Sequence, residues 1–126
     1  MRYERKYRVE TLLLPELLPI LRAHPMSFRR LFPDRQVNNI YFDTEELHFF
    51  RENLVGAGQR QKVRIRWYGP DFVATTNPVM EMKCKDNLLG EKFSVEVADF
   101  AVADRMQLMA TAKAGLNALW ESDAVQ

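Results

Sequence analysis

Basic side chains alternate with apolar ones in the stretch KVRIRWYG, which runs from Lys62 to Gly69. Lys62, Arg64 and Arg66 fall on one parity, and valine, isoleucine and tryptophan fall on the other. A β-strand sends successive side chains to opposite faces of its sheet, so the pattern predicts a strand with one apolar and one cationic face. Arginine offers a planar fork of donors that matches phosphate oxygens, and lysine adds a point charge. A cationic face of this kind is suited to binding phosphate.

The same segregation of charge recurs on three other predicted strands. One face of the predicted sheet collects nine basic residues, namely Lys6, Arg8, Arg60, Lys62, Arg64, Arg66, Lys83, Lys85 and Lys92. Three acidic residues share that face: Glu4, Glu81 and Glu96. Such acids could hold a divalent cation that bridges phosphate oxygens. Because the whole chain has 18 basic and 17 acidic residues and a net charge of only +1, an anion site must come from this local segregation.

The overall composition is typical of a globular domain. The 126 residues are enough for one domain, and 47% of them are hydrophobic. A single cysteine, Cys84, excludes an intrachain disulfide and a cysteine-rich metal site. The charged N-terminus lacks the apolar stretch of a signal peptide, and the longest apolar-rich run, 12–21, is too short to span a bilayer. We therefore expect a cytoplasmic protein without membrane insertion.

The predicted elements belong to the α+β class. Strands are predicted at 2–9, 37–42, 60–68, 79–85 and 91–97, and helices at 11–23, 45–52 and 100–121. The turns between the strands indicate mostly antiparallel pairing. Pro19 is expected to bend or restart the first helix, and a loop is expected from Pro25 to Gln36.

Several side chains outside the cationic face are interpreted as structural. Five apolar residues recur at helical spacing near the C-terminus: Val102, Met106, Met109, Leu116 and Trp120. We expect this stripe to pack in the core or against another subunit. Asp43 is interpreted as a cap or turn residue, and Cys84 as a small buried hydrophobe. His24 and His48 lack metal-ligand spacing and are expected at the surface or at helix ends.

Four segments resemble the VTC domain of polyphosphate polymerases, which falls within the CYTH or triphosphate-tunnel superfamily. They are YERKYRV at 3–9, VNNIYFDT at 37–44, RQKVRIRWYG at 60–69 and VMEMKCKDN at 79–87. Their order and spacing agree with the family pattern. The resemblance predicts a single VTC-like domain over 1–126, with a motif-bearing sheet region at 1–97 and a C-terminal helix at 100–121.

The resemblance implies an antiparallel tunnel whose basic interior binds a triphosphate or polyphosphate. Polymerases of this family move the terminal phosphate of ATP onto a growing chain, assisted by a divalent metal, manganese or magnesium. Carried over by position, the implied phosphate ligands are Lys6, Arg64, Arg66 and Lys83, with Arg8, Arg60, Lys62 and Lys85 as secondary candidates. The implied metal-side or lysine-orienting acids are Glu4 and Glu81.

Two features depart from the family pattern. The first strand of the superfamily often reads E-x-E-x-K, whereas Arg2 occupies the position of the first glutamate here. Such tunnels need about eight strands, and about five are predicted, so we expect about half of a tunnel with an incomplete active site. An open sheet leaves unpaired edge strands, and a homodimer is predicted to cover them.

Two other functions compete with this interpretation. The first is a non-catalytic anion-binding or assembly module, whose charged strand faces are solvated and joined by salt bridges. The second is RNA binding on a basic and aromatic sheet. Tyr3, Trp67 and Phe93 fall on the apolar parity, away from the cations, so no nucleic-acid partner is expected. Both ATP and polyphosphate stay open as ligands of the cationic face.

Overall fold

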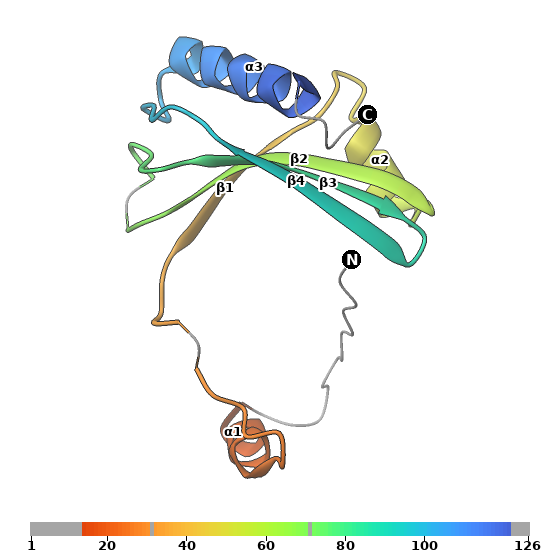
Figure 1. Cartoon of the computed structure of the whole chain (residues 1–126), viewed down its shortest axis with the longest axis vertical. Coiled ribbons are helices and arrows are strands. Elements are labelled where there is room, and N and C mark those ends of the chain that lie inside the picture. The colour runs from red at the N-terminus through yellow and green to blue at the C-terminus, as the bar shows by residue number, and fades with distance from the viewer. Residues whose placement is uncertain (1–13, 31, 71, 122–126) are drawn as a thin grey trace. The chain divides into compact units, whose positions relative to one another are not determined.

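A computed structural model describes residues 14–30, 32–70 and 72–121 of the chain (Figure 1). These residues fall into two compact units, one within 14–34 and the other within 35–121, and each is described by itself. The first unit contains helix α1 (Leu14–Ala23). The second contains, in chain order, β1 (Val37–Phe42), α2 (His48–Leu54), β2 (Gln59–Tyr68), β3 (Val79–Asp86), β4 (Leu89–Glu96) and α3 (Arg105–Glu121).

Helix α1 runs without interruption across Pro19. The expected restart at this proline is therefore wrong; the missing N–H removes only one helical hydrogen bond, and the helix ends four residues later. Beyond its end, the backbone N–H of Met26 donates to Nδ1 of His24 at 3.1 Å, and the rings of His24 and Phe28 are 5.0 Å apart. The predicted strand at 2–9 lies outside the described residues.

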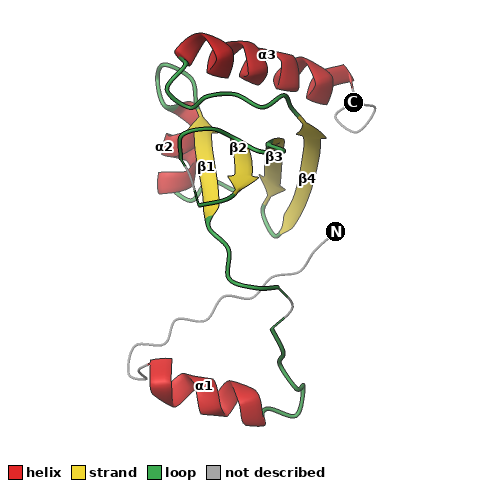
Figure 2. Cartoon of the chain, turned by 90° about the vertical axis from the view of Figure 1, so that its left-hand side faces the viewer, coloured by secondary structure: helices red, strands yellow, loops and turns green. Residues whose placement is uncertain are grey.

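The second unit is built on a four-stranded antiparallel sheet in the order β1-β2-β3-β4 (Figure 2). Ile40 pairs with Ile65, Ile65 with Met80, and Met80 with Val95, so one row of apolar residues crosses all four strands. Within the described part of the chain this sheet is open and does not close into a barrel. The predicted α+β class with antiparallel pairing is confirmed.

Most predicted boundaries agree with the observed elements. The strand predicted at 37–42 has the same ends as β1, and the ends of β2, β3 and β4 lie within two residues of the prediction. Helix α2 begins at His48, three residues later than predicted, because the capping residues lie in the turn before it rather than next to its first residue. Helix α3 likewise begins at Arg105, after Asp104 accepts hydrogen bonds from the N–H groups of Met106 and Gln107.

The hydrophobic core lies between the sheet and α3, which crosses one sheet face (Figure 1). The strands contribute Val63, Ile65, Trp67, Met80 and Met82, all buried on the parity opposite to the basic residues. Phe100, Ala112 and Leu119 complete this core. The apolar parity read from the sequence therefore corresponds to the packed face.

The stripe predicted on the C-terminal helix is only partly correct. Val102 and Leu116 pack against the core, whereas Met106 and Trp120 are 85% and 64% exposed, and Met109 is also exposed. The buried face of α3 is instead formed by small residues and one leucine: Ala112, Gly115 and Leu119. The helix approaches the sheet along this small-residue face, which turns the methionines and the tryptophan to the surface.

Gly115 allows the close approach of α3 to the sheet. A Cβ atom at this position would lie 2.8 Å from Cγ1 of Val97 and 2.9 Å from Sδ of Met80. We expect Gly115→Leu to lower the free energy of unfolding by about 1–3 kcal/mol, because the larger side chain overpacks the contact. Ala114→Leu, at the exposed neighbouring position, is the matched control and should stay within about 0.5 kcal/mol of the wild type. Urea denaturation measures both, and equal values for the two variants would contradict the close contact.

Candidate functional site

The strand registers bring seven of the nine predicted basic residues to one face of the sheet. This cationic face consists of Arg60, Lys62, Arg64, Arg66, Lys83, Lys85 and Lys92. It lies opposite the face that packs under α3, because its residues alternate with the buried ones along each strand. Lys6, Arg8 and Glu4, which the sequence also assigned here, lie outside the described residues.

Glu81 is the centre of an ion-pair network on this face. Its Oε2 atom accepts from Nε and Nη2 of Arg64 at 2.7 and 2.6 Å, and its Oε1 atom accepts from Nζ of Lys92 at 2.6 Å. Nε of Arg66 lies 4.0 Å from the same carboxylate. The residue is only 5% exposed, and water screens its contact with the mostly buried Arg64 side chain less than its contact with Lys92, whose side chain is 53% exposed. Glu81 therefore holds Arg64 and Lys92 in place.

The network also shifts the pKa values of its members. Burial alone would raise the pKa of Glu81, but hydrogen bonds from Lys92 and Arg64, together with their positive charges, outweigh it and hold the pKa below its ordinary value. Burial would likewise lower the pKa of Arg64, yet its hydrogen bonds to Tyr41 and Glu81 outweigh that effect and raise it. The carboxylate and the guanidinium are thus both charged throughout the neutral range.

Three lysines form a row across the middle of the cationic face. Lys62 pairs with Lys83 across β2 and β3, and Lys83 pairs with Lys92 across β3 and β4. Like charges in directly opposed positions repel each other. Lys92 is compensated by Glu81, whereas Lys62 and Lys83 are exposed and form no ion pair with any residue of the described ranges. An anion with several charges would relieve the repulsion in this row.

Two side chains of β1 extend the network, and sequence analysis did not assign them to the site. The hydroxyl of Tyr41 accepts from Nη1 of Arg64 at 3.1 Å, and Oδ1 of Asn39 accepts from Nε of Arg66 at 3.1 Å. Both residues have the parity of Val37 in the segment VNNIYF, and β1 pairs with β2 so that Tyr41 lies opposite Arg64. The alternation in that segment was the signal that could have identified them.

Arg60 and Lys85 lie at the far end of the face, away from Glu81. They are paired across β2 and β3, and Nη1 of Arg60 donates to the carbonyl of Ala57 at 2.6 Å. Both line a pocket of about 560 Å³ near the β3–β4 turn, which also contains Cys84 and Glu91. Burial and the charge of Glu91 raise the pKa of the Cys84 thiol, so this cysteine is protonated at neutral pH.

The family model of the VTC domain matches residues 1–122. The chain belongs to the VTC domain family. This membership associates the chain with polyphosphate polymerases. No curated protein and no solved structure matches the chain.

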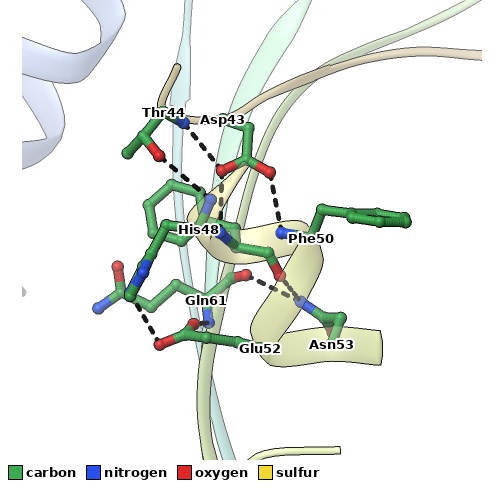
Figure 3. A network of polar contacts seen from close by, with 8 residues as sticks. Asp43, Thr44, His48, Phe50, Glu52, Asn53 and Gln61 are labelled. Atoms are coloured by element: carbon green, nitrogen blue, oxygen red, sulfur yellow. Dashed lines mark hydrogen bonds and ion pairs between the residues drawn. The ribbon is translucent and has the colours of Figure 1, made fainter. Parts of the chain in front are cut away.

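Asp43 in the YFDT segment of this VTC domain is a helix cap, as predicted. Its Oδ1 atom accepts from the N–H groups of Thr44 and Phe49, and its Oδ2 atom accepts from the N–H of Phe50, each at 2.8 Å (Figure 3). The hydroxyl of Thr44 accepts from the N–H of His48 at 3.1 Å. Desolvation would raise the pKa of Asp43, but these hydrogen bonds and nearby His48 outweigh it and lower the pKa.

Helix α2 covers the part of β2 that extends beyond β1. The N–H of Gln61 donates to Oε2 of Glu52 at 3.3 Å, and the carbonyl of Gln61 accepts from Nδ2 of Asn53 at 3.3 Å (Figure 3). Nε2 of His48 lies 3.1 Å from Oε1 of Glu52. The helix thus supplies side-chain partners for strand groups that β1 does not reach.

The described residues do not by themselves form a metal site. Among residues 14–30, 32–70 and 72–121, no cluster of three or more metal-ligating side chains occurs. Both oxygens of Glu81 are occupied by arginine and lysine donors, and Glu4 lies outside these ranges. Of its two predicted alternatives, Glu81 therefore has the contacts of the lysine-orienting acid rather than those of the metal ligand.

In the described part of the chain, no helix has the length and apolar character needed to cross a membrane. This finding concerns the described residues alone.

Replacement of Glu81 by glutamine should make stability less dependent on pH. Because the folded-state pKa of Glu81 is lowered, its stabilising contribution is present above the unfolded value of about 4.3 and is lost as the pH falls through the folded value. We expect Glu81→Gln to lower the free energy of unfolding by about 1–3 kcal/mol at pH 7, and the difference from the wild type to narrow between pH 7 and pH 3.

Urea denaturation across this pH range measures the effect. Glu96→Gln is the control, because Glu96 is an exposed acid on the same face and should change stability by less than about 0.5 kcal/mol. If Glu81→Gln and Glu96→Gln gave the same small change at every pH, the central role of Glu81 in the network would be wrong.

Proposed function

We propose that the cationic face of this VTC domain binds the phosphates of inorganic polyphosphate or of a nucleoside triphosphate. The observation that carries the proposal is the cross-strand pairing of Lys62 with Lys83, two exposed like charges that form no ion pair within the described residues, next to Lys92 on β4. A chain of phosphates provides several negative charges at short spacing and matches such a row. The synthesis of polyphosphate, the use of ATP and the dependence on a metal ion are also parts of this proposal.

Each part of the face has a distinct role in the proposed complex. Arg64 and Arg66 present guanidinium groups whose N–H groups can donate to phosphate oxygens. Lys62 and Lys83 supply exposed positive charge, whereas Glu81 acts as a positioning residue that keeps the Arg64 side chain in a defined orientation. Because Tyr41 and Asn39 hold the other sides of the two arginines, the donors are oriented before a ligand arrives.

Phosphoryl transfer in this family depends on positioning and charge neutralisation rather than on a protein nucleophile. The cationic face can provide both for the phosphate chain. A bound manganese or magnesium ion would neutralise further phosphate charge, but the described carboxylates do not offer its ligands. We therefore derive no catalytic step through a metal.

A second candidate function is a non-catalytic anion-binding module. The ion pairs of Glu81 favour this second function, because they already neutralise part of the charge of Arg64 and Lys92. The two functions share the same ligand and differ in whether the ligand is turned over. A protein that binds triphosphate and also consumes ATP has the first function, and one that binds triphosphate without consuming ATP has the second. In both, we propose that residues 1–126 act as one VTC-like domain.

Removal of Lys62 and Lys83 should weaken triphosphate binding. We expect Lys62→Ala/Lys83→Ala to raise the Kd for inorganic triphosphate by about tenfold or more, since each contact to a charged group contributes about 1.5–3 kcal/mol. Isothermal titration calorimetry measures the Kd, with and without manganese. This double variant leaves Glu81 and its ion-pair partners unchanged, so the protein should still fold.

The control is Arg105→Ala/Lys113→Ala, which removes the same charge from exposed positions of α3. It should change the Kd by less than about threefold, because screened charges at a distance contribute little. If both double variants weakened binding equally, the effect would come from net charge alone and not from the cationic face. If the wild type did not bind triphosphate, the proposed function would be wrong.

We also propose that two copies of the domain associate through exposed apolar side chains of α3. Met106, Met109 and Trp120 are exposed on this helix, and a self-complementary interface is the commonest closed symmetry of soluble oligomers. Light scattering coupled to size exclusion should give twice the chain mass of 14.8 kDa, and Met109→Lys should shift the mass to that of one chain. A wild-type mass of one chain would contradict the dimer.

A further inference from the structure

The pocket near the β3–β4 turn continues the apolar face of the sheet beyond the core. Its volume of about 560 Å³ falls within the range of small-molecule sites. The floor contains a row across three strands, in which Gln61 pairs with Cys84 and Cys84 pairs with Glu91. This row has the parity of the core residues Val63 and Met82. The floor therefore lies on the face opposite the cationic face.

Helix α2 forms a wall of this pocket. Its residue Glu52 accepts from the N–H of Gln61 and lies beside His48 (Figure 3), so the wall is fixed to β2. Apolar surface comes from Phe49 of the same helix and from Leu89 at the start of β4. Leu89 is 50% exposed, which leaves about half of it open to a ligand. The pocket thus combines a polar floor with two apolar contacts.

Two exposed carboxylates of the floor are free to accept a cation. Glu91 and Asp86 both line the pocket, and neither forms an ion pair with any residue of the described ranges. Because Asp86 pairs with Leu89 and Glu91 pairs with Cys84, the two acids are diagonal neighbours on adjacent strands, about 7–8 Å apart. Burial and the charge of Glu91 raise the pKa of the Cys84 thiol, so this negative charge acts at the floor.

Two basic residues also line the pocket, but they belong to the other face of the sheet. Arg60 and Lys85 have the parity of the cationic face. The guanidinium of Arg60 donates to the carbonyl of Ala57. The floor itself therefore has acidic, amide and thiol groups and no basic side chain among its paired residues.

An organic ammonium group fits this floor better than a metal ion or an anion does. Within the described residues no cluster of three metal-ligating side chains occurs. An ammonium group donates three hydrogen bonds and needs only carboxylate or amide oxygens as acceptors. An anion would be repelled by Glu91 and Asp86. An alkyl chain between two ammonium groups would contact Phe49 and Leu89.

We propose that the pocket near the β3–β4 turn binds an aliphatic diamine. One ammonium group donates to Glu91 and the other to Asp86, and the methylene groups between them contact Leu89 and Phe49. A chain of four methylene groups, as in putrescine, spans a distance close to that between diagonal neighbours of a sheet. The inference goes beyond the proposed function, because the amine site lies on the opposite face from Lys62 and needs no phosphate.

Isothermal titration calorimetry of the full chain with putrescine, in a buffer without phosphate, tests the amine site. We expect saturable binding with a Kd of about 1 mM or lower, and no binding of butanol, which has the same carbon chain without charge. Glu91→Gln should raise the Kd about threefold to tenfold, because one carboxylate partner is lost. Glu96→Gln is the matched control, since it removes the same charge from an exposed residue on the opposite face of β4, and it should change the Kd by less than about twofold.

A second pair of variants keeps the test decisive if Glu91→Gln fails to fold. Leu89 lines the pocket, whereas its neighbour Leu88 is 86% exposed and lies outside the lining. We expect Leu89→Ala to raise the Kd for putrescine about twofold to fivefold, because the alkyl chain loses apolar contact. Leu88→Ala should leave this Kd unchanged.

Three results would overturn the amine site. The first is a wild-type chain that does not bind putrescine, and the second is butanol that binds as tightly as putrescine. The third is an equal change of the Kd within each matched pair, for Glu91→Gln and Glu96→Gln and for Leu89→Ala and Leu88→Ala. If putrescine bound as expected and triphosphate did not bind, the amine site would stand and the proposed function alone would be wrong.

Discussion

The carboxylate of Glu81 lies almost completely buried on a sheet face that is otherwise rich in positive charge. A buried carboxylate requires compensating partners, and Arg64 and Lys92 provide them on both sides. In turn, the carboxylate reduces repulsion among basic residues on three adjacent strands. Within the described residues, Lys62 and Lys83 are left as exposed charges without an ion pair beside this network. The cationic face depends on this one acid both for its stability and for the position of its free charge.

The two faces of the sheet are linked by strand register. Val63, Ile65 and Trp67 enter the core because Lys62, Arg64 and Arg66 alternate with them. A shift of pairing by one residue would bury the cations and expose the core residues. The close contact of Gly115 with Met80 and Val97 therefore contributes indirectly to the phosphate site. It seats α3 on the apolar face and so opposes any other register of β3.

The corner formed by α2 connects the edge of the sheet with the cationic face. Asp43 caps the helix, Glu52 and Asn53 bond the backbone of β2 at Gln61, and Tyr41 reaches from β1 to Arg64. These contacts leave apolar side chains exposed beside Lys62. The segment IYFDT and helix α2 after it thus hold the edge of the sheet in place, and their exposed aromatic side chains also line a pocket.

The sequence by itself determined the four strands of the described residues and their faces. Alternation is a local property, so the ends of β1 and the segregation of lysine and arginine on β2 and β3 could be predicted, as could the cap at Asp43. Tertiary structure alone decided which cations pair with Glu81, because Arg64 and Lys92 reach it from other strands. It also decided that α3 packs through Gly115 rather than through Met106 and Trp120. Helical spacing shows which residues share a face, but which face is buried depends on how closely the helix can approach its sheet.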